Sequence, residues 1–354
     1  METRDEDHIA HLFTADSHDL IFFFTDKGSM YWLKVYEIPE GSRTSSGKAI
    51  INLINVEPGE RVKTMLTVPH EDVEKEGFYV VMATKNGYIK KTELLAFKNL
   101  RKTGIRAISI DEDDDLVSAQ ITDGTYEILM STAKGLACRF LETGVRAMGR
   151  TARGVTGIRF KLEGDYLVSM LAVKSLMDVE PLDPASILDE DKEIEIIETE
   201  VEPEIDSEEN GEDEILENAH QILVITDGGM GKRSYVETYR MTRRGARGVT
   251  SIKLKEGEQV ISAINIERGD DIVLTTRGGQ TVRIPTDEIR TIGRASKGVR
   301  IMNLKDKDDS IVSVAKIMFV DGSDENIIDD SSLEENSAND VAENSDEIKP
   351  EINE

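Results

Sequence analysis

The stretch QILVITDGGMGKR (Gln221–Arg233) joins an apolar, β-branched run to a glycine-rich turn and a basic segment. A short run of Val, Ile and Leu such as this one is typical of a buried strand. Gly229 permits the positive φ angle that a tight turn between antiparallel strands requires. The stretch therefore predicts a β-hairpin whose second strand carries positive charge.

The same Thr-x-x-Gly turn follows an apolar run five times and ends at Gly28, Gly87, Gly135, Gly229 and Gly279. A second glycine follows each of these after 17 or 19 residues, at Gly47, Gly104, Gly154, Gly248 and Gly298. An alternating apolar strand and a last apolar strand then complete the unit. Four short strands in a unit of roughly 50 residues are typical of a propeller blade. The sequence therefore predicts an all-β fold of about five complete four-stranded blades.

Charge is distributed unevenly along the 354 residues. Residues 178–218 hold 19 Asp/Glu and one Lys, and residues 319–354 hold 13 Asp/Glu and one Lys. These two segments carry −18 and −12, so the formal net charge of −27 leaves +3 for the rest of the chain. Segments so rich in charge cannot bury enough apolar surface to fold. We expect a repeat domain over 1–318 that contains an acidic disordered insertion at 175–218, and an acidic disordered tail over 319–354.

The start of the chain also bears on its organisation. EDHIAHLFTAD (Glu6–Asp16) resembles the last strand of a unit whose first three strands are missing, which predicts a partial blade and a fragment of a longer protein. Cys138 is the single cysteine, which favours a reducing compartment. No signal peptide and no run of membrane-spanning length occurs. We therefore expect a cytoplasmic protein without a membrane partner.

Small basic loops precede the second glycine of each unit. Three follow the pattern Arg-x-x-[Lys/Arg]-Gly, at Arg150–Gly154, Arg244–Gly248 and Arg294–Gly298, and the loops of the first two units are looser. Small residues let the backbone approach a ligand, and Arg and Lys pair with phosphate oxygens. The DNA-binding residues predicted in these loops are Arg43, Lys48, Arg101, Lys102, Arg150, Arg153, Arg243, Arg244, Arg247, Arg294 and Lys297.

A second basic position lies three or four residues after four of the hairpin glycines. Its members are Lys90, Lys91, Arg139, Lys232, Arg233 and Arg283. If the blades surround an axis, both sets recur at regular intervals and predict two rings of positive charge near one rim. A DNA duplex could follow this track through its phosphates without base readout. Solvated surface loops are the alternative interpretation, which recurrence at a fixed spacing disfavours.

Other chemistry is poorly represented. His8 and His11 lie three residues apart, but no further Cys or His cluster completes a metal site. TDGGMGK (Thr226–Lys232) lacks the spacing of a nucleotide-binding loop. No Ser/His/Asp or Cys/His arrangement indicates a nucleophile. The sequence therefore predicts no active site, no metal and no cofactor in this chain.

Three stretches resemble the C-terminal domain of the bacterial DNA gyrase A protein. They are TDKGSMYWLKVYEIPEGSRTSSGKAIINLI (Thr25–Ile54), ETGVRAMGRTARGVTGIRF (Glu142–Phe160) and TIGRASKGVRIMNL (Thr291–Leu304). The resemblance implies a six-bladed β-pinwheel, a propeller variant in which neighbouring blades exchange strands. Its rim wraps DNA, so that strand passage by the whole enzyme introduces negative supercoils. The family's hallmark box, Gln-Arg-Arg-Gly-Gly-Lys-Gly, is absent, and TRRGARG (Thr242–Gly248) is the nearest local match.

The resemblance also implies partners, namely double-stranded DNA, the rest of the gyrase A protein and the gyrase B protein. It places ATP and Mg²⁺ on other parts of an ATP-dependent type II topoisomerase, and this chain, which lacks the catalytic tyrosine, is expected to cut no DNA alone. The C-terminal domain of topoisomerase IV is one alternative. A protein-interaction propeller is another, although WD40-type Gly-His and Trp-Asp signatures are absent. The acidic tail is expected to compete with DNA for the basic rim.

Overall fold

In the computed structural model, the described residues are 15–41, 47–99, 101, 103–176, 219–306 and 309–317. These residues form β-strands and short 3-10 turns, and no α-helix occurs among them. The prediction of an all-β fold is therefore confirmed. The partial blade predicted before residue 15, the acidic insertion from residue 177 and the acidic tail lie outside the described residues. No helix in the described part of the chain is long and apolar enough to cross a membrane.

Five antiparallel hairpins form the centres of five sheets. They are β1 (Leu20–Thr25) with β2 (Ser29–Lys34), β4 (Tyr79–Thr84) with β5 (Tyr88–Glu93), β8 (Tyr126–Thr132) with β9 (Leu136–Leu141), β12 (Gln221–Thr226) with β13 (Met230–Tyr235), and β16 (Asp271–Thr276) with β17 (Thr281–Pro285). The five predicted turn glycines have φ between 78° and 83°. Residues with a side chain rarely adopt this conformation, which explains why glycine recurs at the turn.

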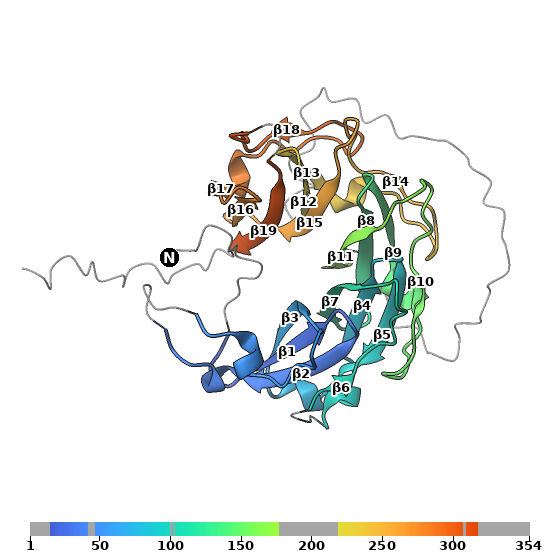
Figure 1. Cartoon of the computed structure of the whole chain (residues 1–354). Coiled ribbons are helices and arrows are strands. Elements are labelled where there is room, and N and C mark those ends of the chain that lie inside the picture. The colour runs from blue at the N-terminus through green and yellow to red at the C-terminus, as the bar shows by residue number, and fades with distance from the viewer. Residues whose placement is uncertain are drawn as a thin grey trace, which may run out of the picture. The chain divides into compact units, whose positions relative to one another are not determined.

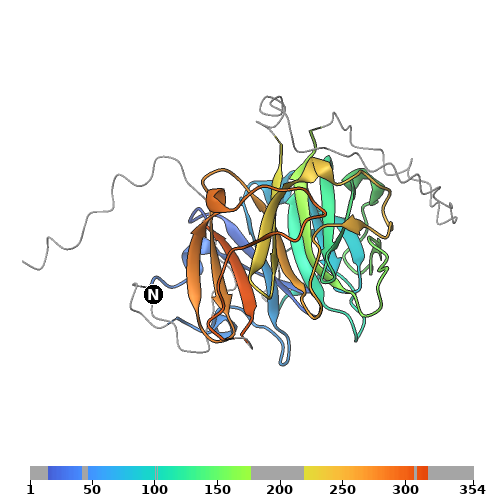
Figure 2. The ribbon, with the colours of Figure 1, turned by 90° about the horizontal axis from the view of Figure 1, so that it is seen from above.

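A third strand pairs with the first strand of each hairpin and lies on the inner side of the arc of blades (Figure 1). These inner strands are β3 (Val62–Val68), β7 (Leu116–Thr122), β11 (Leu167–Lys174), β15 (Val260–Ile266) and β19 (Ile311–Ile317). Successive inner strands contact one another in chain order. Seen from above, the blades stand side by side as in a propeller (Figure 2).

The outermost strand of a sheet comes from the following repeat. β6 (Ile105–Arg106) pairs with β2, β10 (Val155–Thr156) with β5, β14 (Val249–Thr250) with β9, and β18 (Val299–Arg300) with β13. We call these four the exchange strands. The strand exchange implied by the resemblance is thus confirmed. Four sheets have four strands each, and the sheet of β17, β16 and β19 has three among the described residues.

Each exchange strand is followed by an apolar residue that anchors it in the preceding blade. These anchors are Ile108, Ile158, Ile252 and Met302, all at most 4% exposed. The backbone carbonyl of Gly28 accepts hydrogen bonds from Ala107 and Ile108, and a Cβ atom at Gly28 would lie 2.3 Å from the Ile108 carbonyl oxygen. The hairpin glycine is therefore needed both for the turn and for the close approach of the next repeat.

The hydrophobic core lies largely between neighbouring blades. One cluster joins Phe22 and Phe24 of β1 to Val80 and Met82 of β4 and to Phe97 of a 3-10 turn. The 3-10 turns are η1 (Val35–Glu37), η2 (Ile50–Asn52), η3 (Asp72–Glu74), η4 (Leu94–Phe97), η5 (Glu142–Gly144), η7 (Val236–Thr238) and η8 (Thr286–Glu288). Since each blade buries apolar surface against the next, the repeats stabilise one another.

Candidate nucleic-acid interface

Three chain segments cross from one blade to the preceding blade, and we call them the crossing loops. They are VRAMGRTARG (145–154), YRMTRRGARG (239–248) and IRTIGRASKG (289–298). Each begins after η5, η7 or η8 and forms a parallel bridge with the outer hairpin strand of the preceding blade, as Ala147 does with Lys91. Each ends at its exchange strand, on the outer circumference of the arc (Figure 1). The predicted basic loops therefore lie on the rim.

We call each exchange strand together with the three residues after it an exchange segment. Backbone hydrogen bonds join these exchange segments to the adjacent crossing loops. The Ser109 amide donates to the Ala152 carbonyl (3.1 Å), the Arg159 amide to Ala246 (3.1 Å), and the Lys253 amide to Ser296 (3.0 Å). The same kind of contact thus recurs at three successive junctions. The crossing loops and exchange segments form one belt around the rim, which we call the belt.

The first arginine of the basic box links one crossing loop to the neighbouring repeat. The Arg244 guanidinium donates to the carbonyls of Gly144 (3.1 Å) and Thr156 (2.8 Å). Arg294 donates in the same way to the carbonyl of Thr250 (3.0 Å). Both residues are half-buried, as is Arg150 at the equivalent position. Arg244 and Arg294 thus tie each crossing loop to the neighbouring repeat. All three arginines are less accessible than predicted.

The last basic residue of the box faces solvent. Arg153, Arg247 and Lys297 are exposed, as is Arg243 in the middle crossing loop. Arg153 forms an ion pair with Asp111 (2.6 Å) and lies over the Tyr88 ring, 4.0 Å from its centroid. Side chains of this kind can pair with phosphate oxygens at little cost, because they need not leave a buried site. Lys48 and Arg101 are likewise exposed, whereas the predicted residues Arg43 and Lys102 lie outside the described residues.

The second predicted ring is not a surface ring. Lys90, Lys91, Arg139 and Lys232 are buried, because the exchange strands and crossing loops cover the strands that carry them. The prediction of surface charge is therefore wrong for these four residues.

Two of these buried residues, Arg139 and Lys91, lie beside carboxylates. Arg139 forms a buried ion pair with Glu127 (2.7 Å) and donates to the carbonyls of Val236 and Tyr239. Lys91 lies 3.6 Å from Glu142, and burial lowers the pKa of Lys91 although Glu142 opposes the shift.

Arg233 is half-buried and pairs with Asp287 (3.1 Å). Arg283 is the exception among the predicted set: its side chain is 66% exposed and pairs with Asp271 (2.5 Å). No exchange strand among the described residues pairs with its strand, β17. The repeated position therefore has different environments in successive blades.

The structure adds exposed cations that the sequence did not single out. They are Arg146, Arg240 and Arg290 at the start of the crossing loops, and Arg106, Arg159, Lys253 and Arg300 in and after the exchange strands. The first three precede the second glycine by eight residues in three successive repeats, so alignment of the repeats on that glycine could have found them. The other four follow the second glycine by two residues in two repeats and by five residues in the other two, so they have no single fixed spacing. We call these seven residues, together with Arg153, Arg243, Arg247 and Lys297, the rim cations.

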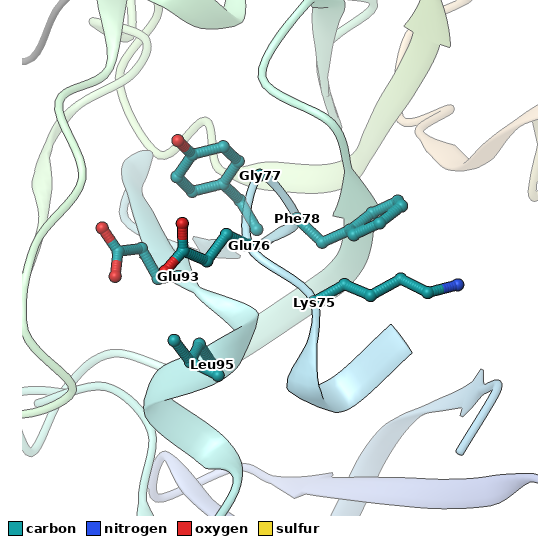
Figure 3. Close-up of a pocket in the computed structure, with 7 residues that line it drawn as sticks. Lys75, Glu76, Gly77, Phe78, Glu93 and Leu95 are labelled. Atoms are coloured by element: carbon teal, nitrogen blue, oxygen red, sulfur yellow. The ribbon is translucent and has the colours of Figure 1, made fainter. Parts of the chain in front are cut away.

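A pocket in the second blade has a different character. It is lined by Lys75, Glu76, Gly77, Phe78, Tyr79, Glu93 and Leu95. Figure 3 shows the carboxylates of Glu76 and Glu93 on one side and the ammonium of Lys75 pointing away from them. Lys75 pairs instead with Glu71 and Asp72. Two carboxylates make this pocket unsuited to a phosphate.

The described residues contain no group of three or more His, Cys, Asp or Glu that could hold a metal ion. Cys138 is buried, and burial raises the pKa of its thiol. A thiol in this state is a poor nucleophile.

Sequence comparison finds relatives along most of the chain. The family model of the DNA gyrase C-terminal domain, a β-propeller, matches residues 19–69, 79–123, 126–174, 220–267 and 270–318. The DNA gyrase A protein of Haemophilus influenzae is 35% identical over 338 residues, which are 95% of this chain and 35% of that protein. The DNA gyrase A protein of Staphylococcus epidermidis is 36% identical over 318 residues, 90% of this chain and 31% of that protein. The chain thus spans about a third of these relatives.

Solved structures have the same fold. The C-terminal domain of DNA topoisomerase IV superposes with a TM-score of 0.65 at 25% identity and covers 85% of this chain and 80% of its own. The DNA gyrase A C-terminal domain superposes with a TM-score of 0.62 at 24% identity and covers 86% and 84%. The five matched segments coincide with the five repeats of the fold, and the chain belongs to the family of DNA gyrase C-terminal domains.

Proposed function

We propose that this chain binds double-stranded DNA without sequence preference and wraps it along the belt. The observation that carries this proposal is the position of the rim cations: they recur on one continuous backbone belt on the outside of the arc. Phosphate neutralisation by Lys and Arg releases counterions and accounts for most non-specific DNA affinity. A curved belt of cations favours bent DNA, because bending brings more phosphates into contact.

The belt has the chemistry of backbone recognition. It presents Arg and Lys on loops and two-residue strands, and no α-helix occurs among the described residues that could enter a major groove. Contacts to phosphates position a duplex but carry no sequence information. The affinity should therefore be similar for unrelated sequences and should fall steeply with salt.

We further propose that the chain serves negative supercoiling as part of DNA gyrase. The relatives that support this are gyrase A proteins, of which the chain spans about a third. In that setting the rest of gyrase A and the gyrase B protein are its partners, other parts of the enzyme use ATP and Mg²⁺, and the complex acts in the cytoplasm. The domain of topoisomerase IV remains the second candidate, since the two solved folds superpose equally well.

A topology assay tests the wrapping. Nicked circular DNA is sealed by ligase in the presence of increasing amounts of the chain, the protein is removed, and the linking number is read on a gel. We expect a shift of one sign that grows with protein concentration. Binding at low salt without any shift would contradict wrapping and would leave the chain as an electrostatic platform.

A further inference from the structure

Two lysines lie beneath the belt. Lys90 and Lys232 each follow a hairpin glycine by three residues, on β5 and β13, and both are 0% exposed. The Lys90 ammonium donates to the carbonyls of Ala107 (2.6 Å) and Arg150 (2.5 Å). The Lys232 ammonium donates to the carbonyls of Gly293 (2.8 Å) and Arg294 and lies 3.4 Å from the Ser296 hydroxyl. Each amine thus holds the backbone of a crossing loop at the first arginine of its basic box.

Neither amine is compensated by a carboxylate among the described residues. The charged side chain that acts on Lys90 is Arg150, and the one that acts on Lys232 is Arg294. Both are cations from the crossing loop above. Burial of a charge that faces a like charge is costly, so simple packing does not account for lysine at these positions.

The remaining charged groups around the two amines are engaged elsewhere. On the same strands, Lys91 pairs with Glu142 and Arg233 with Asp287, and adjacent strand residues point to opposite faces.

Within the described part of the chain, the charged side chains of the neighbouring segments likewise do not contact the two amines. Arg106, next to Ala107, donates to the Lys27 carbonyl, and Arg153 pairs with Asp111. Lys297 is exposed. The Arg139 and Arg233 guanidiniums donate to the carbonyls of Tyr239 and Ile289, where two crossing loops begin. Among the described residues, Lys90 and Lys232 are therefore the lysines whose amines donate to crossing-loop carbonyls.

We propose that Lys90 and Lys232 are positioning residues of the belt: their protonated amines hold two crossing loops in the geometry that binds DNA, and so make DNA affinity depend on pH. This inference rests on the proposed function. A protonated amine has three donors for the surrounding carbonyls, whereas a neutral amine has two donors and a lone pair that repels a carbonyl oxygen.

The proton leaves these amines near neutral pH. Burial, together with the neighbouring arginine, lowers the pKa of Lys90 and of Lys232 to about 7. Phosphates bound to the belt add negative charge above the amines and favour their protonated form. By linkage, DNA binding near neutral pH then takes up protons, and a higher pH weakens the complex.

The middle crossing loop provides a natural comparison. The residue that follows the hairpin glycine Gly135 by three positions is Cys138. Its sulfur lies 3.4 Å from the Thr242 hydroxyl at the start of that loop. A neutral pair therefore occupies the place of the lysine, and this loop should contribute no pH dependence near 7.

The test measures the affinity of the full 354-residue chain for one duplex at constant ionic strength across pH. The variant is Lys90→Met with Lys232→Met. The matched control is Lys85→Met with Lys255→Met, which removes the same charge from two exposed positions outside the belt. Every other ionisable side chain is unchanged in these variants, so a difference between their pH profiles belongs to the substituted lysines.

We expect the affinity of the unmodified chain and of the control to fall roughly three- to tenfold between about pH 6 and pH 8.5. The Met variant should bind weakly over the whole range, with a flat profile. Titration calorimetry in two buffers of different ionisation enthalpy should show proton uptake by the unmodified chain and less by the variant. If the Met variant does not fold, the variant Lys90→Gln with Lys232→Gln is measured in its place, because the Gln side chain keeps an amide donor.

The outcomes separate the two proposals. Equal pH profiles for the chain and for the Met or Gln variant would overturn the role of the lysines and leave DNA binding intact, and so would a flat profile for the unmodified chain. Absence of DNA binding at every pH and at low salt would instead overturn the proposed function, and the inference with it.

Discussion

The exposed cations of the belt and the buried cations beneath it are the same residue types at repeated positions, and their environments are opposite. Arg247 and Lys297 face solvent, whereas Arg139 and Lys232 are covered by the next repeat. Strand exchange causes the difference, because each repeat lays its exchange strand and crossing loop over the preceding hairpin. Cations that a single blade would expose are therefore buried, and they hold in place the loops that carry the exposed cations.

The largest effect is expected from Arg139→Leu. The substitution leaves Glu127 buried without its partner, so the free energy of unfolding should fall by about 3 kcal/mol or more. Arg283→Leu is the matched control, since it occupies the same position of the fifth repeat but is exposed, and it should cost at most about 1 kcal/mol. Denaturant unfolding measures both. Equal losses would contradict the distinction between buried and exposed cations.

The next effect concerns DNA. Replacing Arg243, Arg247 and Lys297 by Ala removes three rim cations without removing a buried contact. Affinity should fall about tenfold or more for all sequences alike, and the slope of log affinity against log salt should flatten by up to about 0.9 for each lost phosphate contact. An unchanged slope would show that these three residues do not contact DNA phosphates.

The control for that variant replaces Lys75, Lys85 and Lys255 by Ala. These lysines are exposed but lie outside the belt. The control changes net charge equally, so it separates local contact from the long-range field. It should keep most of the salt dependence.

A pH-dependent effect on stability tests the same comparison at a buried cation. The pKa of Lys232 is about 7 in the folded chain, against an ordinary value of 10.5. The unfolded chain therefore binds more protons between these values, and the free energy of unfolding contributed by this group rises as pH increases from about 7 to about 10.5. Lys232→Met should remove that part of the rise. Urea unfolding near the two ends of this range measures it, and an undiminished rise in the variant would contradict a buried, uncompensated amine.

The smallest effect is expected from the acidic tail. Residues 319–354 carry −12, and we expect this tethered acidic segment to compete with phosphates for the belt. Deletion after Ile317 should tighten DNA binding several-fold at low salt and less at high salt, since screening weakens the competition. Identical affinities of the full and shortened chains would dispose of this idea.

The repeat could be predicted from the sequence because turns and buried strands depend on residues that are close together in the chain. A tight turn needs glycine at Gly28 or Gly229, and a buried strand needs an apolar run, so both recur visibly. The basic boxes were found for the same reason. Their exposure could not be predicted, because it depends on which repeat covers which strand. Lys90 and Arg101 are both basic residues at repeated positions of the second repeat. Lys90 nevertheless lies under a crossing loop, whereas Arg101 lies at the surface.

Site-directed crosslinking tests the central claim most directly, namely that DNA follows the belt. The single natural cysteine, Cys138, is buried, so Arg153→Cys, Arg247→Cys or Lys75→Cys can each carry a photoactivatable group. We predict crosslinks to bound DNA from Arg153→Cys and Arg247→Cys, which lie in the first and second crossing loops. We predict none from Lys75→Cys beside the acidic pocket. Efficient crosslinking from Lys75, or none from either belt position, would contradict the account.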